Sequence, residues 1–132
     1  RMTNIQAAIG CAQLEDIEKI LTLKQELTQR YQISLNEIAT FQSCNIEKSS
    51  NWINAILLRA EEEIEEVNLR LKENNIEVRP GFPLVHKMIC YEEYNSINLP
   101  ISESISSRTI CLPSFPDLNK NDQEFIISTI LG

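Results

Sequence analysis

The spacing of apolar residues predicts a long helical segment at the start of the chain. Apolar side chains recur at helical intervals over residues 5–12, and a second apolar stripe follows over residues 14–35. The stripe shifts at residues 15–16, so we expect one kinked helix or two helices within residues 1–38. Thr3 is the expected N-cap, because its hydroxyl can accept a hydrogen bond from an amide of the first turn.

The next part of the chain combines strand and helix patterns. Residues 52–58 are aliphatic apart from Trp52 and Asn54, which is typical of a buried strand. Residues 60–74 place apolar side chains on one helical face, and residues 76–79 form a short strand pattern after them. Thr109 begins a third strand that continues to residue 112.

The connections and the C-terminus are assigned from turn and capping residues. Residues 80–83 contain two prolines and a glycine, which predicts a loop, and residues 86–98 are expected to form a loop with at most one helical turn. Ser102 is the expected cap of a short helix, and Asn121 with Glu124 resembles a capping box before a final helix.

These elements predict an α+β fold for a single domain that spans residues 1–132. We expect the long N-terminal helical segment to be followed by a small, mostly antiparallel sheet of about three strands. The helices are expected to pack on one face of that sheet. A chain of 132 residues is long enough to bury a modest core.

Composition narrows the classes of partner. The formal charge is −7, and no cluster of lysine or arginine occurs, which argues against nucleic acids and anionic membrane surfaces as partners. No apolar run approaches the roughly 20 residues that a membrane-spanning helix needs. No signal-peptide pattern is present either, so we expect a cytoplasmic protein.

Metal and acid–base clusters are not expected. The glutamates of residues 61–66 are spread around a predicted helix, which indicates a solvated face. The chain has only one histidine, and its cysteines are too widely separated for a structural zinc site. We expect free thiols, with Cys11 and Cys111 buried. The four cysteines are Cys11, Cys44, Cys90 and Cys111.

Five segments, in order, resemble the sugar aminotransferases of the DegT/DnrJ/StrS family, which are pyridoxal-phosphate enzymes of the aspartate aminotransferase fold type. These are residues 1–14, 50–52, 75–80, 83–88 and 110–116. The resemblance implies that the chain is the C-terminal small domain of such an enzyme. Residues 1–38 would then connect to a missing N-terminal domain that binds pyridoxal phosphate, and the parent enzyme would be a homodimer.

The resemblance also bears on the catalytic lysine. In the family this residue precedes the segment with which the chain begins, so we expect no catalytic residue, no cofactor-binding residue and no pyridoxal phosphate on the chain alone. Five of its six lysines fall on predicted helix surfaces or polar turns, where lysine is normally solvated.

Three residues are candidates for binding a nucleotide-sugar substrate. The resemblance places His86 in a loop that approaches the active-site mouth, although a surface imidazole without a role is an equal alternative. Arg79 could hold a substrate phosphate or cap the sheet edge. Arg1 would lie near a cofactor site that is shared between subunits, where a guanidinium suits phosphate recognition.

Two functions follow from these expectations. In the first, the chain closes the active site of an enzyme that transfers an amino group to a keto-sugar nucleotide and supplies dimer and substrate contacts. In the second, it is a stand-alone module for dimerisation or ligand binding derived from the same fold. The segment of residues 7–12 discriminates between them. Packing within the domain or across a homodimer favours the module, and exposure or disorder of this helix favours a missing domain.

Overall fold

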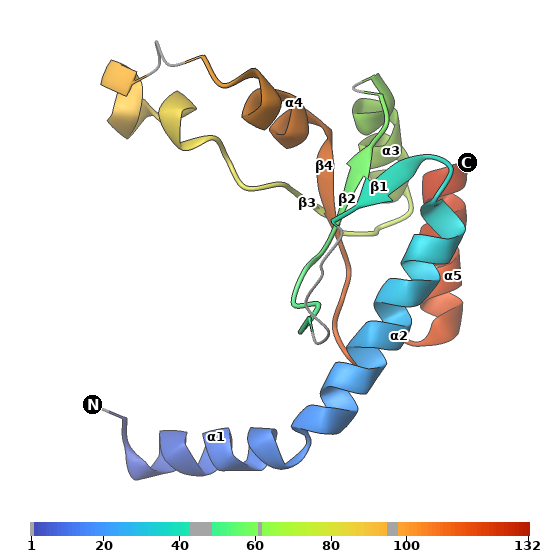
Figure 1. Ribbon diagram of the computed structural model, residues 1–132. Helices are drawn as coiled ribbons and strands as arrows, with labels where there is room; N and C mark the ends of the chain where they lie inside the picture. The colour runs from blue at the N-terminus through green and yellow to red at the C-terminus, as the bar shows by residue number, and fades with distance from the viewer. Residues whose placement is uncertain (1, 43–48, 61, 95–97) are drawn as a thin grey trace.

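A computed structural model describes residues 2–42, 49–60, 62–94 and 98–132 (Figure 1). Two helices open the chain, α1 (Asn4–Glu15) and α2 (Ile17–Leu35), which meet at Asp16. This confirms the predicted break between two apolar stripes.

Thr3 caps α1 as expected. Its hydroxyl accepts a hydrogen bond from the amide of Gln6, and the Gln6 side chain accepts one from the Thr3 amide in return. The helix therefore begins where the sequence indicates.

The sheet has four antiparallel strands in the order β1-β2-β4-β3. The predicted strands appear as β2 (Asn54–Leu58), β3 (Arg79–Pro80) and β4 (Thr109–Leu112). The first two are shorter than expected, because β2 begins two residues later and β3 has only two residues. The additional strand is β1 (Ala39–Phe41), which pairs with β2 at one edge.

Helices cover one face of this sheet. They are α2, α3 (Glu62–Glu73) and α5 (Lys120–Leu131), which stand together on one side of it (Figure 1). Alternate strand residues point toward these helices, so Ile56 of β2 and Ile110 of β4 are fully buried. Their chain neighbours Ala55 and Cys111 lie on the other face of the sheet and are half-buried. The helix-covered face holds the core, and the other face remains open.

The core unites residues that are distant in sequence. Its most buried members are Leu27, Tyr31, Leu35, Ile56, Leu58, Leu71, Ile110 and Ile130. Val67 and Leu71 lie on the predicted apolar face of α3. The Arg70 guanidinium pairs with Glu66 at 2.6 Å between Nη1 and Oε1, and it also donates to the carbonyl oxygens of Thr129 and Ile130 on α5. The helical periodicity of this segment is therefore confirmed.

Between β3 and β4 the chain forms an arm that projects from the sheet (Figure 1). It contains two 3₁₀ segments, η1 (Val85–Lys87) and η2 (Ile89–Tyr94), and the helix α4 (Pro100–Arg108). The expectation of at most one helical turn was wrong, and Ser102 is not the cap. Helix α4 instead begins with Pro100, whose fixed backbone angle suits a first helical position.

The cap of α5 also differs from the prediction. Asn119, rather than Asn121, ends the preceding loop, and its side-chain oxygen accepts a hydrogen bond of 2.9 Å from the Asp122 amide. Asn121 lies inside the helix, where its amide side chain has no capping role. An asparagine can cap a helix at either position, and the sequence pattern alone does not distinguish Asn119 from Asn121.

The prediction of buried cysteines was wrong. Cys11 is exposed because α1 buries none of its residues, and Cys111 is half-buried on the open sheet face. Cys44 lies outside the described residues. Across the described ranges, histidine, cysteine and acidic side chains do not gather into a group of three that would hold a metal. No helix in those ranges has the length and apolarity to cross a membrane.

Candidate functional site

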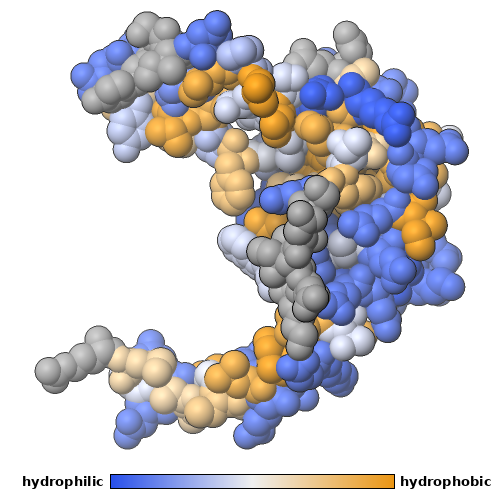
Figure 2. All heavy atoms as spheres, viewed as in Figure 1, coloured by the Kyte–Doolittle hydropathy of each residue, from blue (hydrophilic) through white to orange (hydrophobic). Residues whose placement is uncertain are grey.

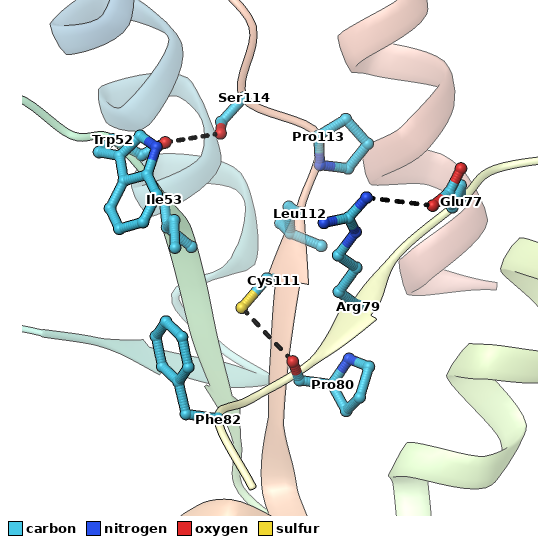
Figure 3. Close-up of a pocket in the computed structure, with 10 residues that line it drawn as sticks. All are labelled: Trp52, Ile53, Glu77, Arg79, Pro80, Phe82, Cys111, Leu112, Pro113 and Ser114. Atoms are coloured by element: carbon cyan, nitrogen blue, oxygen red, sulfur yellow. Dashed lines mark hydrogen bonds and ion pairs between the residues drawn. The ribbon is translucent and has the colours of Figure 1, made fainter.

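The open face of the sheet contains a hollow of about 370 Å³ at the end of β4. Trp52 and Phe82 lie on one side of Cys111, and Arg79 and Glu77 lie on the other (Figure 3). Both aromatic side chains are about three-quarters exposed, Trp52 at 73% and Phe82 at 76%. The hollow therefore combines flat apolar surfaces with one guanidinium and one carboxylate.

This hollow lies on the concave side of the molecule. Helix α1 extends from one end of the body and the arm from the other, so the chain curves around an open space (Figure 1). Figure 2 shows apolar side chains along α1 and along the arm, at the two ends of this concave side. The surface is thus apolar well beyond the hollow itself.

Helix α2 fixes the rim of the hollow through two polar side chains. Lys24 Nζ donates hydrogen bonds to the carbonyl oxygens of Trp52 at 3.2 Å and Ser114 at 2.5 Å. The Tyr31 hydroxyl donates to the carbonyl of Pro113 at 3.1 Å. Burial lowers the pKa of Lys24 and raises that of Tyr31. These hydrogen bonds fix the backbone of residues 52, 113 and 114, which line the hollow.

Arg79 presents its charge to solvent at the hollow. Its Nη2 atom lies 3.7 Å from Glu77 Oε1, and both side chains are more than four-fifths exposed. An exposed ion pair of this kind contributes little. The Cys111 thiol on the hollow floor donates weakly to the Pro80 carbonyl, and burial raises the pKa of this thiol. The guanidinium is therefore the strongest anion-binding group of the hollow.

His86 lies away from the hollow. It is only 7% exposed, and its Nε2 atom lies 3.1 Å from Glu103 Oε1 on α4. Lys87 Nζ lies 3.4 Å from the same oxygen, so two basic side chains of η1 share one carboxylate. This cluster ties the 3₁₀ segment to α4, and the hydrogen bond from His86 lowers the pKa of Glu103, with Lys87 adding to the effect.

Of the three candidate substrate-binding residues, the structure describes Arg79 and His86 and does not bring these two together. Arg79 lines the hollow, His86 lies within the arm, and Arg1 is outside the described residues. Their roles in substrate binding stay predictions. Sequence reasoning missed Trp52, which it placed in a buried strand. The polar residues before Trp52 are the sequence signal that the strand has not yet begun there. In the structure, Asn51 has a left-handed backbone with φ of 46°, and β2 begins after it at Asn54.

Each described lysine is hydrogen-bonded, ion-paired or exposed on a helix surface. Lys24 is held between two carbonyl oxygens, and Lys87 pairs with Glu103. The other three lie on exposed helix surfaces: Lys19, Lys72 and Lys120. Since the amine that binds this cofactor must reach its aldehyde carbon beside a phosphate-binding group, we assign no step of cofactor chemistry to these residues.

Acidification is expected to detach the arm cluster. The pKa of Glu103 is lowered in the folded chain, so its contribution to stability is present above its ordinary value of 4.5 and is lost as the pH falls through the lowered pKa. His86 is the only histidine, so its ring carbon-bound protons give unambiguous nuclear magnetic resonance signals. A pH titration should show an inflection below 4.5 in these signals.

The Glu103→Gln variant should lack this inflection, because an amide does not titrate. The control Glu66→Gln removes a carboxylate that pairs with Arg70 on α3 instead, and it should keep the inflection. If Glu103→Gln retains it, the carboxylate is not the group that holds His86.

Comparison with known proteins gives one consistent result. The family described as the DegT/DnrJ/EryC1/StrS aminotransferases matches residues 1–131. The chain is 38% identical to a GDP-perosamine synthase of Escherichia coli O157:H7 over 136 aligned residues, which cover 98% of the chain and 36% of that protein. It is 37% identical to a GDP-perosamine synthase of Vibrio cholerae, with 89% of the chain and 34% of that protein covered.

Solved structures agree with the sequence comparison. The structure of a DegT DnrJ EryC1 StrS aminotransferase from Brucella abortus superposes with a TM-score of 0.86 and 25% identity. The match covers 100% of the chain and 36% of that structure. The chain therefore spans about a third of the length of the relatives it matches.

Proposed function

Because the chain belongs to the DegT/DnrJ/EryC1/StrS aminotransferase family, we propose that it is the C-terminal domain of a pyridoxal-phosphate-dependent enzyme that aminates a keto-sugar nucleotide. The enzyme would serve amino-sugar biosynthesis for a polysaccharide or lipopolysaccharide. Coverage of about 36% of the relatives supports an N-terminal partner domain. The parent would be a homodimer in the cytoplasm, where the unpaired Cys11, Cys90 and Cys111 are normal.

The hollow on the open sheet face is the observation that carries the proposal for this chain. Trp52 and Phe82 offer flat apolar surfaces on which a sugar or base ring can lie. Arg79 provides a fork of donors that suits phosphate oxygens. The relatives named GDP-perosamine synthase favour a guanosine diphosphate-linked sugar. Arg79 would bind its diphosphate, and we retain His86 and Arg1 as further contacts in the complete enzyme.

The exposure of α1 favours this function over a stand-alone module. None of its residues is buried, and Ile5 and Ile9 are 75% and 60% exposed. A module that folded around its own N-terminal helix would bury these side chains. An apolar helix outside the core instead supports a neighbouring domain that covers it.

We expect the cofactor and the residues of this chain to have separate roles in the reaction. When bound, pyridoxal phosphate supplies the electron sink that lets an amino group move from an amino-acid donor, commonly glutamate, to a keto sugar. The residues described here would hold and orient the nucleotide sugar through Arg79 and the aromatic side chains. The concave surface would keep water from the reacting groups once the partner domain covers it.

Transamination by the complete enzyme tests the proposal. With glutamate, pyridoxal phosphate and a guanosine diphosphate-linked keto sugar, we expect an amino-sugar nucleotide and an equal amount of 2-oxoglutarate. The 132-residue chain alone should form neither product, because we expect the cofactor lysine to belong to the N-terminal partner domain. Absence of both products from the complete enzyme, with uridine and thymidine diphosphate sugars also tried, would contradict the proposal.

A further inference from the structure

Trp52 lies just before the paired part of β2. The register between β2 and β4 begins at Asn54, and Asn51 before Trp52 has a left-handed backbone. Trp52 is 73% exposed, so packing of the ring itself fixes its position only in part. The position of the ring therefore depends on what holds the Trp52 backbone.

Two donors meet at the Trp52 carbonyl oxygen. Lys24 Nζ on α2 donates to it at 3.2 Å. Ser114 Oγ, in the chain that follows β4, also donates to it at 3.2 Å (Figure 3). Lys24 Nζ donates in addition to the Ser114 carbonyl at 2.5 Å, so one ammonium group joins both segments. Because a hydrogen bond from a charged donor is stronger than one from a hydroxyl, Lys24 provides the main link.

The face of α2 that carries Lys24 reaches the sheet at several points. Lys24, Thr28 and Tyr31 follow the helical spacing i, i+4 and i+7. Thr28 Oγ1 lies 2.7 Å from Asn54 Oδ1, and the Tyr31 hydroxyl donates to a carbonyl just after β4. Of these three side chains, Lys24 is the one that reaches the Trp52 carbonyl. Its contact can therefore be removed while the other two remain.

We propose that Lys24 is a positioning residue for substrate binding, which holds the Trp52 backbone so that the indole ring faces the sugar or base of the nucleotide sugar. Lys24 does not line the hollow itself, so it acts through Trp52. This inference rests on the proposed function, in which the Trp52 ring offers a flat surface to the substrate. A ring that is already held loses less conformational freedom on binding, which favours affinity. The effect belongs to binding of the nucleotide sugar and not to the transfer of the amino group.

Tryptophan fluorescence of the complete enzyme tests the position of the ring without substrate. Trp52 is the single tryptophan of this chain, and subtracting the polarised emission of a Trp52→Phe enzyme removes any signal from the partner domain. Lys24→Met removes the donor and keeps a side chain of similar length. We expect it to lower the anisotropy of the Trp52 emission, because the ring moves more freely. Unchanged anisotropy would overturn the proposal.

Steady-state kinetics test the consequence for binding. Since a net hydrogen bond corresponds to about a two- to tenfold change in an equilibrium constant, Lys24→Met should raise KM for the nucleotide sugar by that factor and leave kcat unchanged. Lys24→Arg keeps a charged donor and should restore part of the affinity and of the anisotropy. In a Trp52→Ala enzyme, Lys24→Met should raise KM no further, because residues that act through one another are not additive. A further rise in that background would show an independent role and refute the proposal.

Thr28→Val is the matched control on the same face of α2. It removes the hydroxyl beside Asn54, which is 3% exposed, so it should lower stability while KM and the anisotropy stay at their wild-type values. A rise in KM as large as that of Lys24→Met would assign the effect to general loosening of α2 and contradict the proposal. If Trp52→Ala keeps the wild-type KM, the proposed function of the hollow fails, whereas the anisotropy still decides whether Lys24 holds Trp52.

Discussion

Tyr31→Ala is expected to lower the free energy of unfolding by about 3–5 kcal/mol, the usual cost of removing a buried aromatic ring. Tyr31 is 0% exposed and lies in the core among side chains of α2 and the sheet. Domains of this size are stabilised by only about 5–15 kcal/mol. The variant should therefore lose a large share of its stability and unfold at a much lower urea concentration. Urea denaturation followed by circular dichroism measures the difference.

Tyr31→Phe separates packing from hydrogen bonding in the same position. It keeps the ring and removes only the hydroxyl that donates to the Pro113 carbonyl, so we expect a loss of about 1 kcal/mol. If the two variants lose the same stability, the ring does not fill the core as described. Their order is thus a direct check on the contact between α2 and the end of β4.

Arg79→Ala in the complete enzyme is expected to raise the apparent KM for the nucleotide sugar about 10- to 100-fold. A hydrogen bond to a charged group contributes about 1.5–3 kcal/mol, and each tenfold change corresponds to about 1.4 kcal/mol. Because Arg79 would bind the diphosphate rather than the reacting carbon, kcat should change little. Steady-state kinetics at varied nucleotide sugar and saturating glutamate measures both constants.

Two further variants at this position sharpen the result. Arg79→Lys keeps the charge but loses the planar fork of donors, so it should recover only part of the affinity. Glu77→Gln removes the carboxylate that lies 3.7 Å from the guanidinium and should leave KM unchanged or lower it. A wild-type KM for Arg79→Ala would show that the hollow does not bind the diphosphate.

Helices α2 and α3 were predictable because their apolar spacing reflects the faces they bury. The break at Asp16 and the buried face of α3 both follow from a period of 3.6 residues. Strand β1 escaped prediction because it has only three residues, and its pairing with β2 rather than its own composition makes it a strand. The cap of α5 was misplaced because asparagine occurs at two nearby positions and only the backbone geometry selects Asn119.

The site was less predictable than the fold. Arg79 was a candidate from the start, and the structure places it at the hollow. The exposure of Trp52 depends on where β2 begins, which local composition does not reveal. His86 was singled out from its loop, but its contact with Glu103 joins residues separated by 17 positions in the sequence. Such a pairing emerges only when the segment η1 folds back on α4.

The two outer strands of the sheet also bear on how the chain avoids aggregation. Exposed sheet edges can pair with edges of other molecules and start fibril-like assembly. Here the edges are β1, with three residues, and β3, with two, one of which is Pro80 and lacks an amide donor. Neither edge offers a long row of donors and acceptors. The chain can therefore expose the apolar surfaces of α1 and the arm while its sheet edges resist extension into a larger sheet.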